Sequence, residues 1–479
     1  MNNILKNFLS ILTGNFLGKI LAFIFSLYIA RELGAEVFGV VNFANSIITY
    51  FFMISSMGLQ TYGILQISKI NNEKYSNEEA SNIFSEIMSS RLILTIISIF
   101  CLIIYLILSK NLNISIKIMI LLYGLTIISN CLNIDWYFTA IKNMKLNSIW
   151  IIIQNSVSLI ALILLNVLDI KNMYIIPITI FIGGMIANIV LIIKASKRIK
   201  FKLSMDITRI LTLVKLSFPF FFSGIFATIN CNIDTIFLGY MTNPVEVGLY
   251  NSAYKIINML IVIATIIFTP VYPILIELYN NENSINFNKL TNLVNIVRKI
   301  IMIISIPILF ISFILGKNII STFYGETYIE ASNVLSILLI YVALLYIREL
   351  YGYRLNACGL QNKYMKIVCF SAFINIVLNI ILIPIWGMIG SAITTLVSEI
   401  INLIFMYYIS QKYKYIKNVN NYLVKIIVSS LIISIICVFI KTYFSNAILI
   451  SIIGLSIYII LIISIGVIKK SDLIFLREN

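Results

Sequence analysis

The sequence predicts an all-α membrane protein with about fourteen transmembrane helices. Of its 479 residues, 60% are hydrophobic and only 11% are charged, whereas soluble domains carry about 25% charged residues. The longest apolar stretches, such as Leu92–Ser109 and Ala447–Ile468, hold no charged side chain. They match the roughly 20 residues that a helix needs to cross about 30 Å of hydrocarbon. Membrane β-strands would be about 10 residues long and would alternate apolar with polar residues.

Fourteen segments of this kind follow one another along the chain. They lie near residues 8–30, 41–64, 91–109, 115–137, 148–168, 174–193, 210–233, 248–272, 298–316, 333–353, 364–384, 387–409, 422–440 and 446–468. The segments at 364–384 and 387–409 are joined by a tight turn at Pro384–Gly387. An even number of crossings places both termini on the same side of the membrane.

The basic residues predict which side this is. With the N-terminus in the cytoplasm, 26 of the 35 Lys and Arg residues fall in cytoplasmic segments, 6 fall outside and 3 lie within spans. This bias follows the positive-inside rule and accounts for most of the net charge of +16. Nucleic-acid binding is therefore not needed to account for the charge, and we expect membrane lipids to contact the basic run at 194–202. We expect cytoplasmic N- and C-termini.

A short motif repeats between the two halves of the chain. Gly39-Val-Val-Asn-Phe-Ala44 opens the second span and Gly248-Leu-Tyr-Asn-Ser-Ala253 opens the eighth, with the same glycine, asparagine and alanine positions. Because the second and eighth spans are six crossings apart, an even number, both run in the same direction. This predicts two six-helix lobes related by a parallel pseudo-two-fold repeat, plus two extra C-terminal helices. The expected domains are an N-terminal lobe (1–193), a basic cytoplasmic linker (194–209), a C-terminal lobe (210–415) and the additional helices with the tail (416–479).

Several cations lie where charge is costly. A charged side chain at the bilayer centre costs about 2.5–3.5 kcal/mol on insertion scales, so such residues usually face a wet cavity or a partner. The candidates for a substrate-binding cavity are Lys19, Lys215 and Lys255 within spans, and Arg348 and Arg354 in or just below the tenth span. Lys215 can instead extend to the membrane surface, and the two arginines can instead be interfacial anchors. Both alternatives stay open.

Polar side chains at helical spacing accompany these cations in the first two spans of each half. The predicted cavity-lining residues are Asn15, Asn42, Asn45, Asn251 and Tyr254. Amides can instead join helices to one another. Asp135 and Asp234 are candidates for coupling to a cation. A cavity lined by cations and amides suits an anionic, hydroxyl-rich head group.

Some functional classes lack support. The chain contains no histidine and no Cys-x-x-Cys pair, so neither a structural zinc site nor histidine catalysis is indicated. No phosphate-binding loop of the Walker type and no channel filter is visible, and the loops are too short for a catalytic domain. We therefore expect a secondary transporter that is not an enzyme and needs no cofactor or metal.

The segment Asp135-Trp-Tyr-Phe-Thr-Ala-Ile-Lys-Asn-Met-Lys145 resembles a stretch common in polysaccharide (O-antigen type) flippases of the multidrug/oligosaccharidyl-lipid/polysaccharide exporter superfamily. Ala30-Arg-Glu-Leu-Gly-Ala-Glu-Val-Phe-Gly39 and Gly248–Ala253 are also similar to that family, and the likeness covers roughly residues 1–415. Thr139-Ala140 departs from the Gln-Gly that the family often has, so no role is assigned to these two positions.

The resemblance implies a V-shaped, two-lobed helical fold and an undecaprenyl-diphosphate-linked oligosaccharide as cargo. The expected function is a flippase of the bacterial cytoplasmic membrane that works by alternating access in surface polysaccharide synthesis. Its expected partners are the lipid-linked oligosaccharide, membrane lipids and a polysaccharide polymerase or glycosyltransferases. The alternatives are a lipid II flippase, a multidrug or cation antiporter of the same superfamily, and a scaffold protein without transport. The excess of cations over acids within the spans argues against an antiporter of cationic drugs.

Overall fold

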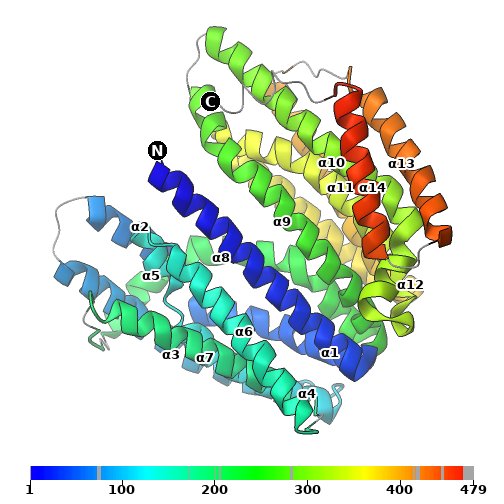
Figure 1. The fold of residues 1–479 in the computed structure, drawn as a ribbon. Helices are drawn as coiled ribbons and strands as arrows, with labels where there is room; N and C mark the ends of the chain where they lie inside the picture. The colour runs from blue at the N-terminus through cyan, green and yellow to red at the C-terminus, as the bar shows by residue number, and fades with distance from the viewer. Residues whose placement is uncertain are drawn as a thin grey trace. The chain divides into compact units, whose positions relative to one another are not determined.

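A computed structural model describes residues 2–72, 77–170, 172–199, 201–203, 206–280, 284–413, 416, 421–443 and 447–467. Within these ranges all regular secondary structure is helical. The chain divides into two compact units, Met1–Tyr240 and Met241–Asn479. The all-α fold that the composition predicts is therefore confirmed for the described part of the chain (Figure 1).

In the described residues, the first unit holds eight α-helices. They are α1 (Asn2–Ser56), α2 (Leu59–Asn72), α3 (Asn77–Leu108), α4 (Ile114–Leu132), α5 (Asp135–Ala140), α6 (Lys145–Val167), α7 (Ile175–Ala195) and α8 (Ile207–Met241). The second unit holds α9 (Pro244–Asn280), α10 (Ser284–Tyr324), the short 3₁₀ helix η1 (Glu326–Tyr328), α11 (Ala331–Ala357), α12 (Gln361–Tyr413), α13 (Leu423–Tyr443) and α14 (Ala447–Ser464).

Eleven of these helices are long and apolar enough to cross a membrane. Two of them, α1 and α12, are each broken by a glycine with non-helical backbone angles, Gly34 and Gly387, so each supplies two crossings. The apolar segment Leu449–Ser464 in α14 is shorter than these candidate spans, and counting it as a crossing brings the total to about fourteen. The prediction of about fourteen spans is confirmed. The parallel repeat between the halves stays a prediction.

The break in α12 is a tight hairpin. Gly387 has a φ of 52°, a left-handed value that favours glycine. A Cβ on Gly390 would lie 2.4 Å from the carbonyl oxygen of Leu382, so the two arms of the hairpin touch through their backbones. The Oε2 atom of Glu246 accepts a hydrogen bond of 2.9 Å from the Met388 amide and so satisfies the first turn of the second arm. The turn expected at Pro384–Gly387 is confirmed.

Two helices begin well before the spans that hydropathy predicts. The sequence predicts the third span at 91–109, yet α3 begins at Asn77. It predicts the ninth at 298–316, yet α10 begins at Ser284. Hydropathy detects only the part of a helix that lies in hydrocarbon. The polar first turn of α3 carries Glu78 and Glu79, which interact favourably with the helix N-terminus. Arg91 therefore lies inside a helix rather than at its start.

Each unit has its own apolar clusters. In the first unit Trp136 is fully buried and stacks on Phe84 with ring centroids 5.5 Å apart, within a cluster that also includes Ile134 and Leu191. In the second unit α13 and α14 lie side by side (Figure 1) and pack on α10. The two C-terminal helices are thus joined to the second unit by an extensive apolar contact.

Helix α8 contacts the first unit at several separate points. The Ser217 hydroxyl donates a hydrogen bond of 2.8 Å to the Met57 carbonyl, and a Cβ on Gly224 would lie 2.8 Å from Cε of Met53. At the far end the ring of Tyr240 contacts that of Phe43 edge-on at 5.4 Å. The boundary between the two compact units therefore lies after Tyr240, at the end of α8. The lobes and the linker at 194–209 that the sequence predicts are defined by repeat and charge, and they stay a prediction.

Candidate functional site

The two candidate lysines of the first unit lie on α1 and α8. The chain packs the face of α1 that carries Gly14 and Gly18 against α6, where Asn155 donates a hydrogen bond of 3.0 Å to the Gly18 carbonyl. Lys19 is the next residue, about 100° further round the helix, and it is exposed. Lys215 is also exposed. Neither lysine has a hydrogen bond or ion pair with the residues that the structure describes. The side chain of Asn15 lies outside the described residues.

The amides at the start of the second and eighth predicted spans serve their own helices. Asn42 is buried and its Nδ2 donates to the Phe38 carbonyl at 2.7 Å. Asn251 is buried as well and donates to the Val247 carbonyl at 2.9 Å. Asn45, by contrast, is exposed. Burial and backbone bonding favour a structural role for Asn42 and Asn251, whereas Asn45 is accessible to a ligand.

Lys255 is the candidate lysine of the second unit. It lies on α9, half-buried, three turns from the helix start. Its ammonium makes no ion pair or hydrogen bond with any residue in the described ranges. Tyr254, its neighbour, stacks on Tyr250 with ring centroids 5.8 Å apart. Lys255 is therefore available to an anionic group that reaches α9.

Arg348 is held by two carboxylates. Its Nε atom lies 2.7 Å from Oε1 of Glu399, and its Nη1 atom lies 2.9 Å from Oε1 of Glu349. The Glu399 side chain is only 4% exposed, so the second arm of α12 carries a buried acid whose charge is compensated from α11. With one cation and two acids, this group has a formal charge of −1. An anionic ligand of Arg348 would have to compete with both glutamates.

Arg354 is buried one and a half turns further along α11. Its Nε atom donates a hydrogen bond of 3.0 Å to the Tyr279 hydroxyl, and its guanidinium lies over the Tyr351 ring, 5.9 Å from the centroid. These contacts join the end of α9 to the end of α11. The side chain is 1% exposed, so its present position favours a role in holding helices together.

The first unit contains a fully buried arginine that the charge pattern placed in a cytoplasmic segment. Arg91, in the middle of α3, is 0% exposed. Its Nη1 and Nη2 atoms donate hydrogen bonds of 2.6 Å to the carbonyls of Asn133 and Asn130, at the C-terminal end of α4. Asp135 lies within electrostatic range of this guanidinium. Arg91 thus binds the helix end from which the Asp135-Trp136 motif begins.

The two acidic candidates occupy different surroundings. Asp135 is half-buried at the first turn of α5, where its backbone amide donates to the Asn133 side chain at 2.9 Å. Asp234 is 3% exposed on α8, within electrostatic range of Tyr50. In the part of the chain that the structure describes, no group of three or more His, Cys, Asp or Glu residues is placed to hold a metal ion.

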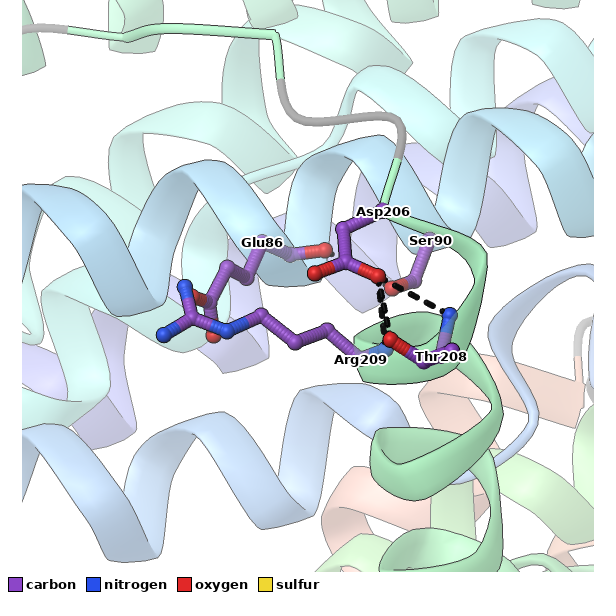
Figure 2. Close-up of polar contacts among 5 residues, drawn as sticks. All are labelled: Glu86, Ser90, Asp206, Thr208 and Arg209. Atoms are coloured by element: carbon purple, nitrogen blue, oxygen red, sulfur yellow. Dashed lines mark hydrogen bonds and ion pairs between the residues drawn. The ribbon is translucent and has the colours of Figure 1, made fainter.

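The basic linker lies against α3. The Lys202 amide donates a hydrogen bond of 3.0 Å to the Ser85 hydroxyl. Arg209, at the start of α8, forms an ion pair with Glu86 (Figure 2). Asp206 caps α8 through hydrogen bonds that its Oδ1 accepts from the Thr208 hydroxyl and from the Thr208 amide at 3.0 Å. These hydrogen bonds, that of the Thr208 hydroxyl above all, lower the pKa of the Asp206 carboxyl below its ordinary value.

The sequence gives no sign of a site role for Arg91 or Tyr279, whereas Glu349 and Glu399 stand out as acids within apolar spans, without an assigned role. An acid within an apolar span is itself a signal for a functional or paired residue, and that signal was present for both glutamates. No sequence signal pairs Arg348 with Glu399, which is 51 residues away. Arg91 directly precedes an apolar run, so its position in the sequence is that of a cation at the edge of the membrane.

Comparison with known proteins places this arrangement in a family. The model of the family described as "Polysaccharide biosynthesis protein" matches residues 4–279, and the MatE model matches residues 219–381. The chain is 24% identical over 412 residues to the capsular polysaccharide biosynthesis protein CapF of Staphylococcus aureus, covering 84% of this chain and 98% of CapF. It is 23% identical over 381 residues to a putative O-antigen transporter of Escherichia coli strain K12, covering 78% and 88% of the two chains.

Solved structures share the fold. The lipid II flippase MurJ in an inward closed conformation aligns with a TM-score of 0.74 at 19% identity, covering 94% of this chain and 97% of that chain. A multidrug resistance MATE transporter in an inward-facing conformation aligns with a TM-score of 0.62 at 12% identity, covering 83% and 95%. Together with the match to more than half of the sequence, these findings show that the chain belongs to the polysaccharide biosynthesis protein family, a group of multi-pass membrane proteins in the multidrug/oligosaccharidyl-lipid/polysaccharide exporter superfamily of flippases and transporters.

Proposed function

We propose that this protein is a flippase that moves undecaprenyl-diphosphate-linked oligosaccharide repeat units from the cytoplasmic to the outer leaflet of a bacterial cytoplasmic membrane. It would act by alternating access in the synthesis of a surface polysaccharide. The names of two relatives support this proposal, since one is a capsular polysaccharide biosynthesis protein and the other a putative O-antigen transporter. The family resemblance of the Asp135–Lys145 segment supports the same cargo class.

The observation that carries the proposal is the presence of uncompensated cations on apolar helices. Lys19 and Lys255 lie within candidate membrane spans and have no ionic partner among the described residues. A lysine in hydrocarbon without a partner costs several kcal/mol, so its retention is best explained by a ligand or a wet cavity. An ammonium group is a strong donor to phosphate oxygens. The diphosphate of the cargo supplies such an anion.

The remaining candidates differ in how readily they could contact the cargo. Lys215 is exposed and is accessible to the same anion. Arg348 would contribute only if the diphosphate displaces Glu349 or Glu399, and Arg354 only if it releases Tyr279. Asn45 and Tyr254 would donate hydrogen bonds to sugar hydroxyls. Asp135 and Asp234 stay candidates for cation coupling.

The proposal is tested by flipping in liposomes. Purified protein is reconstituted with a fluorescent prenyl-diphosphate oligosaccharide, and the fraction that reaches the outer leaflet is measured with a membrane-impermeant quencher. We expect Lys19→Ala and Lys255→Ala each to slow flipping about 10-fold or more, because a hydrogen bond to a charged group contributes about 1.5–3 kcal/mol. Lys255→Arg should keep much of the rate because it keeps the charge. Lys317→Ala, at an exposed residue near the end of α10, is the matched control.

Two outcomes would contradict the proposal. If both alanine variants flip the glycolipid at the wild-type rate, these lysines do not bind the cargo. Transport of a cationic drug, with no flipping of the glycolipid by the wild-type protein, would favour the antiporter alternative. Lipid II in place of the oligosaccharide distinguishes the peptidoglycan precursor from a polysaccharide repeat unit in the same assay.

A further inference from the structure

A narrow apolar cavity lies in the first unit. Its volume is about 210 Å³, and it is bounded by α3, the end of α4, the end of α7 and the linker. Met88 and Leu92 line it from α3, Leu132 from α4, Ile192 from α7, and Ile199 and Phe201 from the linker. The lining includes a single hydroxyl, that of Ser196. A cavity with so few polar partners is a poor site for water and a good one for a hydrocarbon chain.

The linker forms one wall of this cavity because it is anchored to α3. Ile199 is buried in the apolar cluster around Trp136, and the Phe201 ring meets Phe84 edge-on at 6.5 Å. The next residue, Lys202, donates a hydrogen bond from its backbone amide to the Ser85 hydroxyl. The Arg209–Glu86 ion pair, on the same helix one residue further along, secures the start of α8 (Figure 2). The linker is thus held in place through Ile199, Phe201 and Lys202, and the start of α8 is held against α3 by the ion pair.

The same segment presents a cluster of positive charge. Lys194, Lys197, Arg198 and Lys202 are all exposed. None of the four side chains forms an ion pair within the described residues. Two of them lie between Ser196 and Ile199, which line the cavity. Hydrocarbon-lined space and cations without an ionic partner are therefore adjacent on one short stretch of chain.

We propose that this part of the protein is a binding site for an anionic phospholipid of the surrounding bilayer. One acyl chain occupies the cavity between α3, α4 and α7, and the phosphate lies among the linker cations. Basic pockets between membrane helices on the cytoplasmic side are suited to anionic head groups, and the positive-inside prediction places the linker on that side. The site shares no residue with the lysines proposed to bind cargo, so it goes beyond the proposed function.

The role of the linker cations in binding the phosphate is tested by measuring how much lipid the protein retains. Full-length protein in detergent is incubated with phosphatidylglycerol or phosphatidylcholine, and retained lipid is measured by native mass spectrometry. We expect retention of phosphatidylglycerol only. The double variant Lys197→Gln/Arg198→Gln should weaken this binding about 25-fold, or about 5-fold for each charge, the equivalent of ~1 kcal/mol per cation near a head group. Lys142→Gln/Lys145→Gln removes two exposed cations from the turn before α6 and its first residue and should leave binding unchanged.

The cavity half is tested by filling it. Ile192→Trp places a large ring in the cavity and should abolish phosphatidylglycerol retention, whereas Ile193→Trp, at an exposed neighbour outside the lining, should not. Equal retention of phosphatidylcholine, or unchanged binding in both the glutamine and the Ile192 variants, would overturn the proposal. Displacement of phosphatidylglycerol by an equimolar amount of undecaprenyl phosphate would overturn it too, because the site would then belong to the cargo's prenyl chain.

Discussion

Arg91 illustrates how one buried side chain can complete a helix end in an apolar environment. The last carbonyls of any α-helix lack intrahelical donors, and inside a membrane no water is present to replace them. The guanidinium of Arg91 supplies two of these donors to the end of α4. A guanidinium suits this task because its donors are fixed in one plane. The segment that carries the family resemblance begins immediately after this helix end.

We expect Arg91→Met to lower the free energy of unfolding by about 2–6 kcal/mol, because it leaves two buried carbonyls unpaired at a cost of ~1–3 kcal/mol each. Denaturant titration in detergent micelles would measure the change. Arg209→Met is the control, since Arg209 is 65% exposed and the loss of a surface ion pair costs at most about 1 kcal/mol. Equal effects of the two substitutions would show that Arg91 is not the main donor to α4.

Among the elements, the α12 hairpin depends most directly on the absence of a side chain. Gly390 and the Leu382 carbonyl approach so closely that any Cβ would collide with backbone. Backbone cannot move aside as a flexible side chain can, so the two arms would have to separate. The Glu246 bond to the Met388 amide would be strained by the same movement.

Gly390→Asn should therefore cost about 1–3 kcal/mol, as overpacking usually does. Gly359→Asn is matched to it, because Gly359 has a φ of +75° with nothing within 4 Å of its Cβ position, and asparagine tolerates that backbone region. Thermal unfolding monitored by fluorescence would distinguish the two variants. A loss of the same size at both positions would contradict the proposed clash.

The first turn of α8 should depend on pH through Asp206. A carboxyl whose pKa is lowered in the folded state stabilises that state above its ordinary pKa of about 3.9, and the contribution disappears as the pH falls through the lowered value. Hydrogen exchange at the amides of Thr208 and Arg209 should therefore accelerate, relative to intrinsic rates, only under strongly acidic conditions. Asp206→Asn can still accept these bonds and should abolish this pH dependence. Wild-type exchange that follows the intrinsic rate at every pH would contradict the cap.

For the whole molecule, the distribution of basic residues predicts the orientation. Lys110 and Lys142 are both exposed and are expected on opposite sides of the membrane. In a chain whose native cysteines are replaced, Lys110→Cys should react with an impermeant maleimide in intact cells. Lys142→Cys should react only after the membrane is opened. The reverse pattern would invert the topology and move the linker to the outer face.

The helices could be predicted from sequence because their signal, apolar length, is local. The fourteen crossings and the hairpin at Pro384–Gly387 were found in this way. Side-chain partners from distant parts of the chain could not be predicted in this way. The Arg348–Glu399 and Arg354–Tyr279 contacts both join positions far apart in the sequence. Arg91 shows the same limit: its position before an apolar run is that of a loop cation, and only the length of α3 places it in the interior.

The attachment of α8 along the first unit has a practical consequence. Ser217, Gly224 and Tyr240 each contact α1 or the turn that follows it, and we expect these contacts to keep α8 on the first unit when the linker is cut. A protease nick in the linker should leave two pieces that co-purify as one particle. Split halves encoded by separate genes should likewise reassemble, which would let each be isotope-labelled alone.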